Sequence, residues 1–233
     1  AYTDTIAPRF VSTLLAAALD HRRRTGEGAY IDLAQLEAAL HFLAPEILDF
    51  QATGYLPTRA GNRDRFGAPQ GCYPCAGEDQ WCAIAVDNDA QWVALAQAIG
   101  RPEWAGGELA SNAQRLAAHD TIDEVICAWT RERGPREVMD TLQAAGVPAG
   151  VVQRSSDLLA DPQYAHREFY RYHDHPEMGH IPYAGHQYRI EGYDNGPRGP
   201  APLLGEHSFE VLSELLGLDE EAIGNAFASG AIT

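Results

Sequence analysis

The longest irregular stretch of the sequence, residues 54–71, contains the residue types best suited to binding an anion. It is locally cationic within an acidic protein because it carries three arginines, Arg59, Arg63 and Arg65. Gly61 and Gly67 allow backbone N–H groups to approach a ligand closely. Such a loop can hold a carboxylate or stabilise an oxyanion. The alternative is a solvated surface loop with ordinary turn residues, but long glycine-bearing loops in compact domains are often functional, which favours the ligand site.

The histidines of His173-Asp-His175, together with His180, have a spacing that suggests a metal site. Alternate residues of a strand share one face, so two of these imidazoles could converge on an ion. Polar residues are also expected at a strand end, and Pro176 follows directly here. We therefore interpret the histidines as strand-end residues and predict no metal site.

Cys72-Tyr-Pro-Cys75 has the C-x-x-C spacing of redox pairs and of zinc half-sites. A redox pair requires a strand-to-helix junction, whereas a turn and an apolar strand follow in this chain. A structural zinc site requires four ligands, and only Cys82 lies near in the sequence. The pattern therefore favours cysteines that are buried in strands.

Glu206 and His207 could form an acid/base pair, because histidine titrates near neutrality. However, Glu206 or Ser208 at a helix N-terminus would also be favoured by capping and by the helix dipole, so we prefer a structural or supporting role. The sequence has no Gly-x-Ser-x-Gly elbow, no G-x-G-x-x-G, no P-loop and no cysteine with an obvious histidine partner.

The composition argues against several classes of partner. The 233 residues carry a net charge of −16, from 33 acidic and 17 basic residues. Nucleic acid and anionic membranes both need a cationic face, so we expect neither as a partner. Every basic residue is arginine, which excludes a Schiff-base lysine or a phosphate-binding lysine within these residues. No apolar run approaches the roughly 20 residues that span a bilayer. We expect a soluble, cytoplasmic protein.

Short helices and strands alternate in the middle of the chain. Periodicity and turn residues predict strands at 71–75, 80–86 and 147–153, a helix from Asp87 or Asn88 to Ile99, three helices within 111–146, a short helix at 155–159, and two strands within 169–190. Thr121 and Glu124 have the spacing of a capping box, and Asp120 is an equally good N-cap.

Helical periodicity dominates both ends of the chain. A first helix is predicted to begin at Pro8 and to end at Gly26. A second helix, from Gln35 with a kink at Pro45, is apolar around much of its circumference, which predicts burial on more than one side. Near the other end, an amphipathic helix stops at Gly217. These flanks lack an obvious core of their own, so we expect them to pack on residues outside this chain.

Four segments, taken in order, resemble the class III CoA-transferase (CaiB/BaiF) family. They are Leu15–Gly28 with Ile31–Ala38, Gly61-Asn62 with Ala68–Tyr73, Ala145–Val151 with Asp161-Pro162, and Ala201–His207 with Leu212–Leu218. The resemblance implies an α/β fold in which a small α/β domain is inserted into a Rossmann-like large domain, and two subunits interlock as a homodimer. Residues 1–55 would be a helical part of the large domain with a linker, residues 56–188 the small domain, and residues 189–233 the return to the large domain.

The resemblance also implies the transfer of CoA from an acyl-CoA to a carboxylic acid through aspartyl-anhydride and aspartyl-CoA intermediates. Coenzyme A would be a substrate, and no cofactor would be bound permanently. In such enzymes a glycine-bearing loop covers the intermediate, which here assigns substrate binding to Gly61, Asn62, Arg63, Arg65, Gly67, Ala68 and Pro69. The nucleophilic aspartate is expected upstream of Ala1, since Asp4 lacks the surrounding motif, so no catalytic residue is assigned. We expect a C-terminal portion that is inactive without its N-terminal half.

Two alternatives stay open at this point. An acyl-CoA racemase of the same superfamily would remove the proton α to the thioester, which requires an acid/base pair. A non-catalytic structural subunit would need no nucleophile at all.

Overall fold

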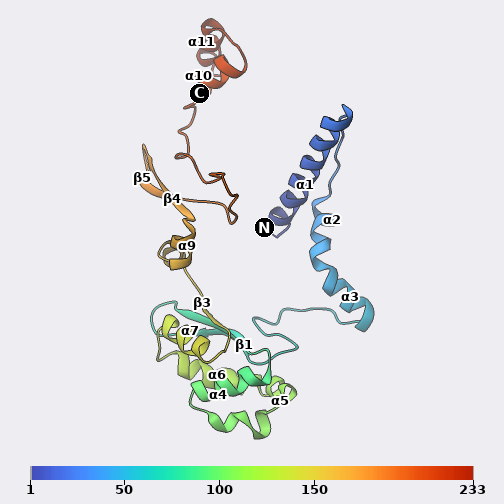
Figure 1. Ribbon diagram of the computed structural model, residues 1–233, viewed down its shortest axis with the longest axis vertical. Helices are drawn as coiled ribbons and strands as arrows, with labels where there is room; N and C mark the ends of the chain where they lie inside the picture. Colours follow the sequence, from blue (N-terminus) through green and yellow to red (C-terminus); the bar gives the residue numbers. More distant parts are fainter. Residues whose placement is uncertain (1, 233) are drawn as a thin grey trace.

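A three-stranded antiparallel sheet and four helices form the densely packed unit of the protein, as the computed structural model of residues 2–232 shows (Figure 1). In chain order its elements are β1 (Gln70–Pro74), β2 (Trp81–Ala85), α4 (Asp89–Ala98), α5 (Asn112–Ala117), α6 (His119–Thr130), α7 (Pro135–Ala144) and β3 (Ala149–Val151). Strand β2 lies between β1 and β3 and is antiparallel to both. The mixed α/β character predicted for the middle of the chain is confirmed.

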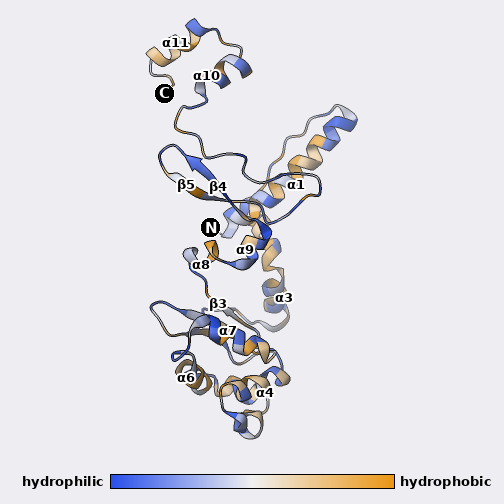
Figure 2. Ribbon diagram, turned by 60° about the vertical axis from the view of Figure 1, so that its left-hand side comes forward, coloured by the Kyte–Doolittle hydropathy of each residue, from blue (hydrophilic) through white to orange (hydrophobic). Residues whose placement is uncertain are grey.

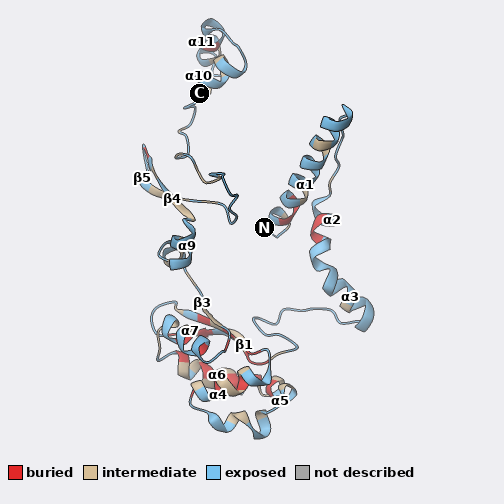
Figure 3. Cartoon of the chain, in the orientation of Figure 1, coloured by how far each residue is buried: buried red, intermediate tan, exposed pale blue. Residues whose placement is uncertain are grey.

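The helices cover the sheet face that carries Cys82, Ile84 and Val86, which are at most 3% exposed. Most of the buried residues of the chain lie in this unit (Figure 3). The helices contribute buried side chains from α4, α6 and α7, namely Trp92, Leu95, Ile122, Ile126, Val138 and Leu142. Burying each large apolar side chain contributes about 1.5–3 kcal/mol, so this cluster holds the unit together.

The opposite face of the sheet has small side chains. Cys72, Ala83 and Gly150 are cross-strand neighbours in the register of the three strands. Cys72 is exposed, so the prediction that the cysteines are buried in strands is wrong for this residue. It is also wrong for Cys127, which is half-buried in α6. Neighbouring residues of a strand point to opposite faces, so within β1 Tyr73 is buried and Cys72 is exposed, and Cys75 is buried just beyond the end of the strand.

Before the packed unit, the chain forms α1 (Tyr2–Thr25), α2 (Gln35–Leu40), a 3-10 turn (His41–Leu43) and α3 (Ala44–Thr53). Helix α1 begins at Tyr2, so the prediction that Pro8 is its first residue is wrong. Pro8 lies inside the helix, where its missing N–H removes one intrahelical hydrogen bond without ending α1. Gly26, at φ +81°, ends α1 as predicted. The kink predicted at Pro45 is observed as a break in the helix: the 3-10 turn His41–Leu43 separates α2 from α3, and Pro45 is in the first turn of α3.

The apolar side chains of these flanking helices are largely exposed. Ala38 and Ala39 of α2 are buried, but Leu36 and Leu48 are 67% and 63% exposed. The predicted burial of this segment on more than one side is therefore wrong within the described chain, because α1 covers only one side of α2. Figure 2 shows apolar residues (orange) interspersed with polar ones along α1.

After the packed unit come α8 (Ser155–Leu159), α9 (Pro162–Arg167), the hairpin of β4 (Tyr170–His175) and β5 (Gly179–Ala184), α10 (Ser208–Glu210), a π-helical turn (Val211–Leu215) and α11 (Glu220–Ala228). The hairpin and its turn lie where the sequence predicts them. The helical residues before Gly217 end there as predicted, with φ at +67°. Leu204 and Leu215 are 94% and 79% exposed, so this end also presents uncovered apolar surface.

Helix caps in the packed unit are partly as predicted. The Asn88 side chain accepts a 3.0 Å hydrogen bond from the Gln91 N–H and caps α4. The capping box predicted for Thr121 and Glu124 is wrong, because α6 begins at His119 and follows α5 after one residue, which leaves no extended N-cap there. Among residues 2–232, no helix is both long and apolar enough to cross a membrane.

Candidate functional site

The anion-binding candidate, here called the 61–71 loop, runs from the end of a coil after α3 into the first residues of β1. Gly61 has φ +66°, a backbone conformation that favours glycine, and it forms a turn in which the Arg63 N–H bonds to the Ala60 carbonyl. The first part of the loop faces α6, and the last part faces α5. The contacts at each end decide what the predicted residues can do.

Arg63 is held at α6 by two carboxylates. Its Nη2 bonds to Asp120 and, at 2.9 Å, to Asp123 Oδ2. The other oxygen of Asp123 accepts a 2.7 Å hydrogen bond from the Tyr73 hydroxyl and lies 3.5 Å from His119 Nε2. The hydrogen bond from Arg63 lowers the pKa of Asp120. Burial, followed by the neighbouring Asp123 carboxylate, raises the pKa of Tyr73, so this hydroxyl stays protonated.

Arg65 is held on the other side, toward α3. Its Nη1 donates to Asp49 Oδ2 at 2.8 Å, and its guanidinium lies 4.0 Å from the Tyr55 ring centroid and 4.5 Å from that of Phe66. Arg63 and Arg65, two of the three arginines noted in the sequence, therefore point to different helices, and each is already paired with a carboxylate. The other polar side chains of the loop are Asp64, which accepts a 2.6 Å hydrogen bond from the Phe66 N–H, and Asn62 and Gln70, which line a pocket described below.

Gly67, Ala68 and Pro69 form the inner end of the loop. Ala68 and Pro69 are fully buried, and the Pro69 carbonyl accepts a 3.0 Å hydrogen bond from the Val86 N–H. A Cβ added to Gly67 would lie 3.3 Å from the Val86 carbonyl oxygen, which is tighter than ordinary van der Waals contact. The absence of a side chain at position 67 thus lets the loop approach the end of β2.

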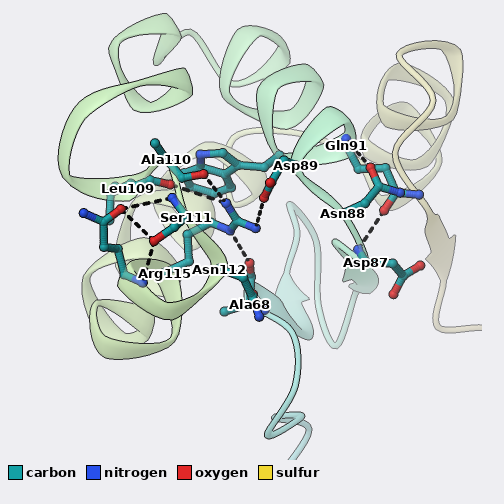
Figure 4. Close-up of polar contacts among 12 residues, drawn as sticks. Ala68, Asp87, Asn88, Asp89, Gln91, Leu109, Ala110, Ser111, Asn112 and Arg115 are labelled. Carbon is teal, nitrogen blue, oxygen red and sulfur yellow. Dashed lines mark hydrogen bonds and ion pairs between the residues drawn. The ribbon is translucent and has the colours of Figure 1, made fainter.

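Arg115 is a residue that sequence reasoning missed. It lies in α5 and is 1% exposed. Figure 4 shows its guanidinium among carbonyl groups: Nε donates to the Ala68 carbonyl at 3.1 Å, and Nη1 donates to that of Ala110 at 2.9 Å. Nη2 donates to Asp89 Oδ1 at 2.7 Å, and the guanidinium carbon lies 5.3 Å from the Trp92 ring. One side chain therefore links the loop, the α4 start and the turn before α5.

A pocket of about 470 Å³ lies beside the loop, on the small-residue face of the sheet. Asn62 is the predicted site residue that lines it, together with Gln70 at the start of β1. Cys72, Ala83 and Gly150 line the same pocket from the three strands. A second pocket of about 220 Å³ is lined by Gly61, Asn62 and Arg63 on the α6 side. A mostly apolar pocket of several hundred Å³ with a few polar groups is typical of a small-molecule site.

The other candidate groups have local partners. His180 Nδ1 lies 2.8 Å from Asp174 Oδ1, across the hairpin, and His175 Nδ1 accepts hydrogen bonds from two backbone N–H groups of the turn. No group of three potential ligands is clustered for a metal ion within residues 2–232. Glu206 accepts a 2.6 Å hydrogen bond from the Leu203 N–H, which closes the turn before α10.

Over most of its length the chain is similar to CoA-transferases. The model of CoA-transferase family III matches residues 1–208. A probable CoA-transferase of Mycobacterium tuberculosis is 32% identical over 93% of this chain and 27% of its own length. Succinyl-CoA–D-citramalate CoA-transferase of Chloroflexus aurantiacus is 31% identical over 94% of this chain and 54% of its own length.

A solved structure is also similar to this chain in fold. A crystal structure of a CaiB/BaiF family protein from Brucella suis matches with a TM-score of 0.79 and 27% identity, covering 92% of this chain and 55% of that chain. The chain therefore spans about half the length of this structure and of the Chloroflexus relative, and about a quarter of the mycobacterial one.

Proposed function

Because the chain belongs to CoA-transferase family III, we propose that it is part of an enzyme that moves CoA from an acyl-CoA to a carboxylic acid. The observation that carries this proposal is the match of the family over residues 1–208, which include the whole 61–71 loop. Succinyl-CoA is the first donor to test, because the Chloroflexus relative is named for it.

The proposed reaction exchanges one activated acyl group for another. An aspartate carboxylate oxygen attacks the thioester carbonyl, the C–S bond breaks, and the CoA thiolate leaves with the electron pair, giving a mixed anhydride. The thiolate then attacks the aspartyl carbonyl, which releases the donor acid and forms an aspartyl-CoA thioester. The acceptor carboxylate attacks the aspartyl carbonyl of this thioester, the C–S bond breaks, and a second mixed anhydride and free CoA thiolate result. The thiolate then attacks the acceptor acyl carbonyl of that anhydride, which forms the new acyl-CoA and frees the aspartate carboxylate. Every intermediate stays activated, so one difficult step becomes several easier ones.

The 61–71 loop is proposed to contribute to the acyl-CoA site through Gly61, Asn62, Arg63, Arg65, Gly67, Ala68 and Pro69. Support comes from the two pockets that Asn62 lines and from the close approach of the loop backbone to the sheet. The Arg63 and Arg65 pairs with carboxylates fit a role in holding the loop's shape. Backbone N–H groups fixed in this way are suited to stabilising a developing oxyanion.

The catalytic nucleophile and the domain arrangement are proposed as follows. We place the nucleophilic aspartate upstream of residue 1, residues 56–188 in a small domain, and residues 1–55 and 189–233 in a Rossmann-like large domain of an interlocked homodimer. The uncovered apolar faces of α1, α3 and the C-terminal helices support this arrangement, because exposed apolar surface of this extent marks an interface. The chain's span of about half the Chloroflexus relative also supports it.

Reconstitution tests the proposal. The chain is mixed with the N-terminal half encoded upstream, and succinyl-CoA is supplied with a panel of carboxylic acids. We expect a new acyl-CoA with the mixture and none with either part alone. A full-length protein that forms no new acyl-CoA with any acid, yet exchanges the α proton of an acyl-CoA with deuterated water, would instead be a racemase. A parent protein without a nucleophilic aspartate would instead be a structural subunit.

A further inference from the structure

The inner end of the 61–71 loop is fixed by side chains of α5, and we propose that Arg115 is a positioning residue for acyl transfer. It holds the Ala68 carbonyl against α4 and α5 and thereby keeps the loop closed over the activated acyl group. This inference rests on the proposed function, because it assigns a cause to the loop's placement.

The surroundings of Arg115 are unusual for a buried charge. Removing a guanidinium from water is costly unless its N–H groups are bonded. Its one carboxylate partner, Asp89, has a side chain that is 74% exposed, whereas the Arg115 side chain is 2% exposed. An ion pair with so exposed a partner contributes little. The remaining bonds go to backbone carbonyls of the loop and of the turn before α5, so the residue serves to join segments.

Ala68 is bound at both of its backbone polar groups. Arg115 Nε donates to its carbonyl at 3.1 Å, and Asn112 Oδ1 accepts from its N–H at 3.3 Å. Asn112 Nδ2 also donates to the Phe66 carbonyl at 2.6 Å. Asn112 and Arg115 are three apart in α5 and so lie on one side of the helix. Residues 66–68 therefore cannot move without breaking hydrogen bonds to α5.

An apolar side chain at position 115 could fill the same space but would leave the buried Ala68 carbonyl without this donor. Lysine would keep the charge, but it lacks the planar fork that reaches three acceptors in different directions. In either case the loop would loosen at Ala68, while the hydrophobic core under the sheet would stay intact.

A loosened loop would change the fate of the intermediate. Water adding to the acyl carbonyl of the mixed anhydride breaks the bond to the aspartate oxygen, releases the donor acid, and frees the aspartate carboxylate, with the proton passing to solvent. This hydrolysis competes with the return of the CoA thiolate. The ratio of hydrolysis to transfer does not depend on how much enzyme is folded, so it separates positioning from stability.

The experiment uses the full-length enzyme with succinyl-CoA and its acceptor acid and measures free CoA and new acyl-CoA together. For Arg115→Lys we expect the ratio of hydrolysis to transfer to rise about tenfold or more, because a misplacement of about 1 Å can cost on the order of 10²-fold in rate. Arg133→Lys is the matched control. Arg133 donates to the Trp129 carbonyl at 2.7 Å and lies 4.6 Å from the Trp129 ring, so it shares the carbonyl and ring contacts of Arg115, with a side chain that is 30% exposed and does not contact the loop. Its ratio should equal that of the wild type.

Asn112→Ala serves as the second variant if Arg115→Lys does not fold, and it should shift the ratio in the same direction. Amide hydrogen exchange of residues 66–70 should also be faster in both variants. Folded variants with the wild-type ratio and wild-type exchange would overturn the role of Arg115 and leave the proposed function in place. A wild-type enzyme that makes no new acyl-CoA would overturn the proposed function, and this inference with it.

Discussion

Replacing Tyr73 by phenylalanine tests the polar network under the outer end of the loop. Tyr73 is 2% exposed, and its hydroxyl donates to Asp123 Oδ1 at 2.7 Å. Hydrogen bonds to charged groups contribute about 1.5–3 kcal/mol. Asp123 is partly exposed and keeps its bond to Arg63, so we expect the lower end of this range. Tyr73→Phe should lower the unfolding free energy by about 1.5 kcal/mol at pH 7.

The same change alters the pH dependence of stability. Burial and the adjacent carboxylate raise the pKa of Tyr73 in the folded state above the unfolded value of about 10. The hydroxyl's contribution is therefore fully present below about pH 10 and is lost above it by about 1.4 kcal/mol per pH unit. The wild-type and Tyr73→Phe stability curves should converge near about pH 11, where this loss equals the initial difference.

Urea unfolding read by tryptophan fluorescence is the suitable assay, because all four tryptophans lie between residues 81 and 129. Tyr193→Phe is the control, since Tyr193 is largely exposed. Ionisation of the buried cysteines also lowers the unfolding free energy at alkaline pH, equally in the wild type and in Tyr73→Phe. The quantity to compare is therefore the difference between their unfolding free energies at each pH. Curves that stay parallel from pH 7 to 11 would refute the account of Tyr73 and Asp123.

Three further outcomes follow from the structure. Gly67→Val should lower transfer by the full-length enzyme on the order of 10²-fold, because its Cβ would lie 3.3 Å from the Val86 carbonyl oxygen. Leu142→Ala should cost about 2–5 kcal/mol of unfolding free energy, measured by urea titration, because this side chain is fully buried under the sheet. Burial raises the pKa of Cys82 to about 11, so at pH 8 a thiol reagent should label exposed Cys72 first, and Cys72→Ser should remove the fast phase.

Each of these outcomes has a control in the chain. Gly28→Ala should keep full transfer, because nothing lies within 4 Å of a Cβ there. In the chain on its own, Leu204→Ala should leave the unfolding free energy unchanged within about 0.5 kcal/mol, since Leu204 is exposed there. Normal turnover by Gly67→Val would remove the loop from the site, and an unchanged midpoint for Leu142→Ala would contradict the assigned core. Equal labelling of Cys72 and Cys82 in the folded protein would contradict the assigned sheet faces.

Local sequence signals predicted the packed unit well. Asn88 caps α4, Gly134-Pro135 begins α7 and Gly146 follows its end, as the residue types predict. Helix caps and helix-ending glycines depend only on residues within about one helical turn, so they can be recognised in a single sequence. Strand alternation also indicates that Cys72 and its neighbour Tyr73 cannot both be buried on the same face of β1.

Contacts between distant segments were not predictable in the same way. Arg115 sits in an ordinary helical sequence, and its bond to Ala68 joins residues 47 positions apart. The carboxylates that pair with Arg63 and Arg65 are also distant, so the loop looked more freely cationic than it is. The exposed faces of α2 and α3 carry a burial signal in the sequence, but the described chain contains no surface that covers them.

We propose that this chain belongs to a catalyst that exchanges CoA between acids. One incubation of the full-length protein with succinyl-CoA and a second carboxylic acid in deuterated water, read by mass spectrometry of the acyl-CoA pool, tests this activity. We expect a new thioester that carries the second acid, without deuterium at the α carbon. Deuterium incorporation without any new thioester would contradict it.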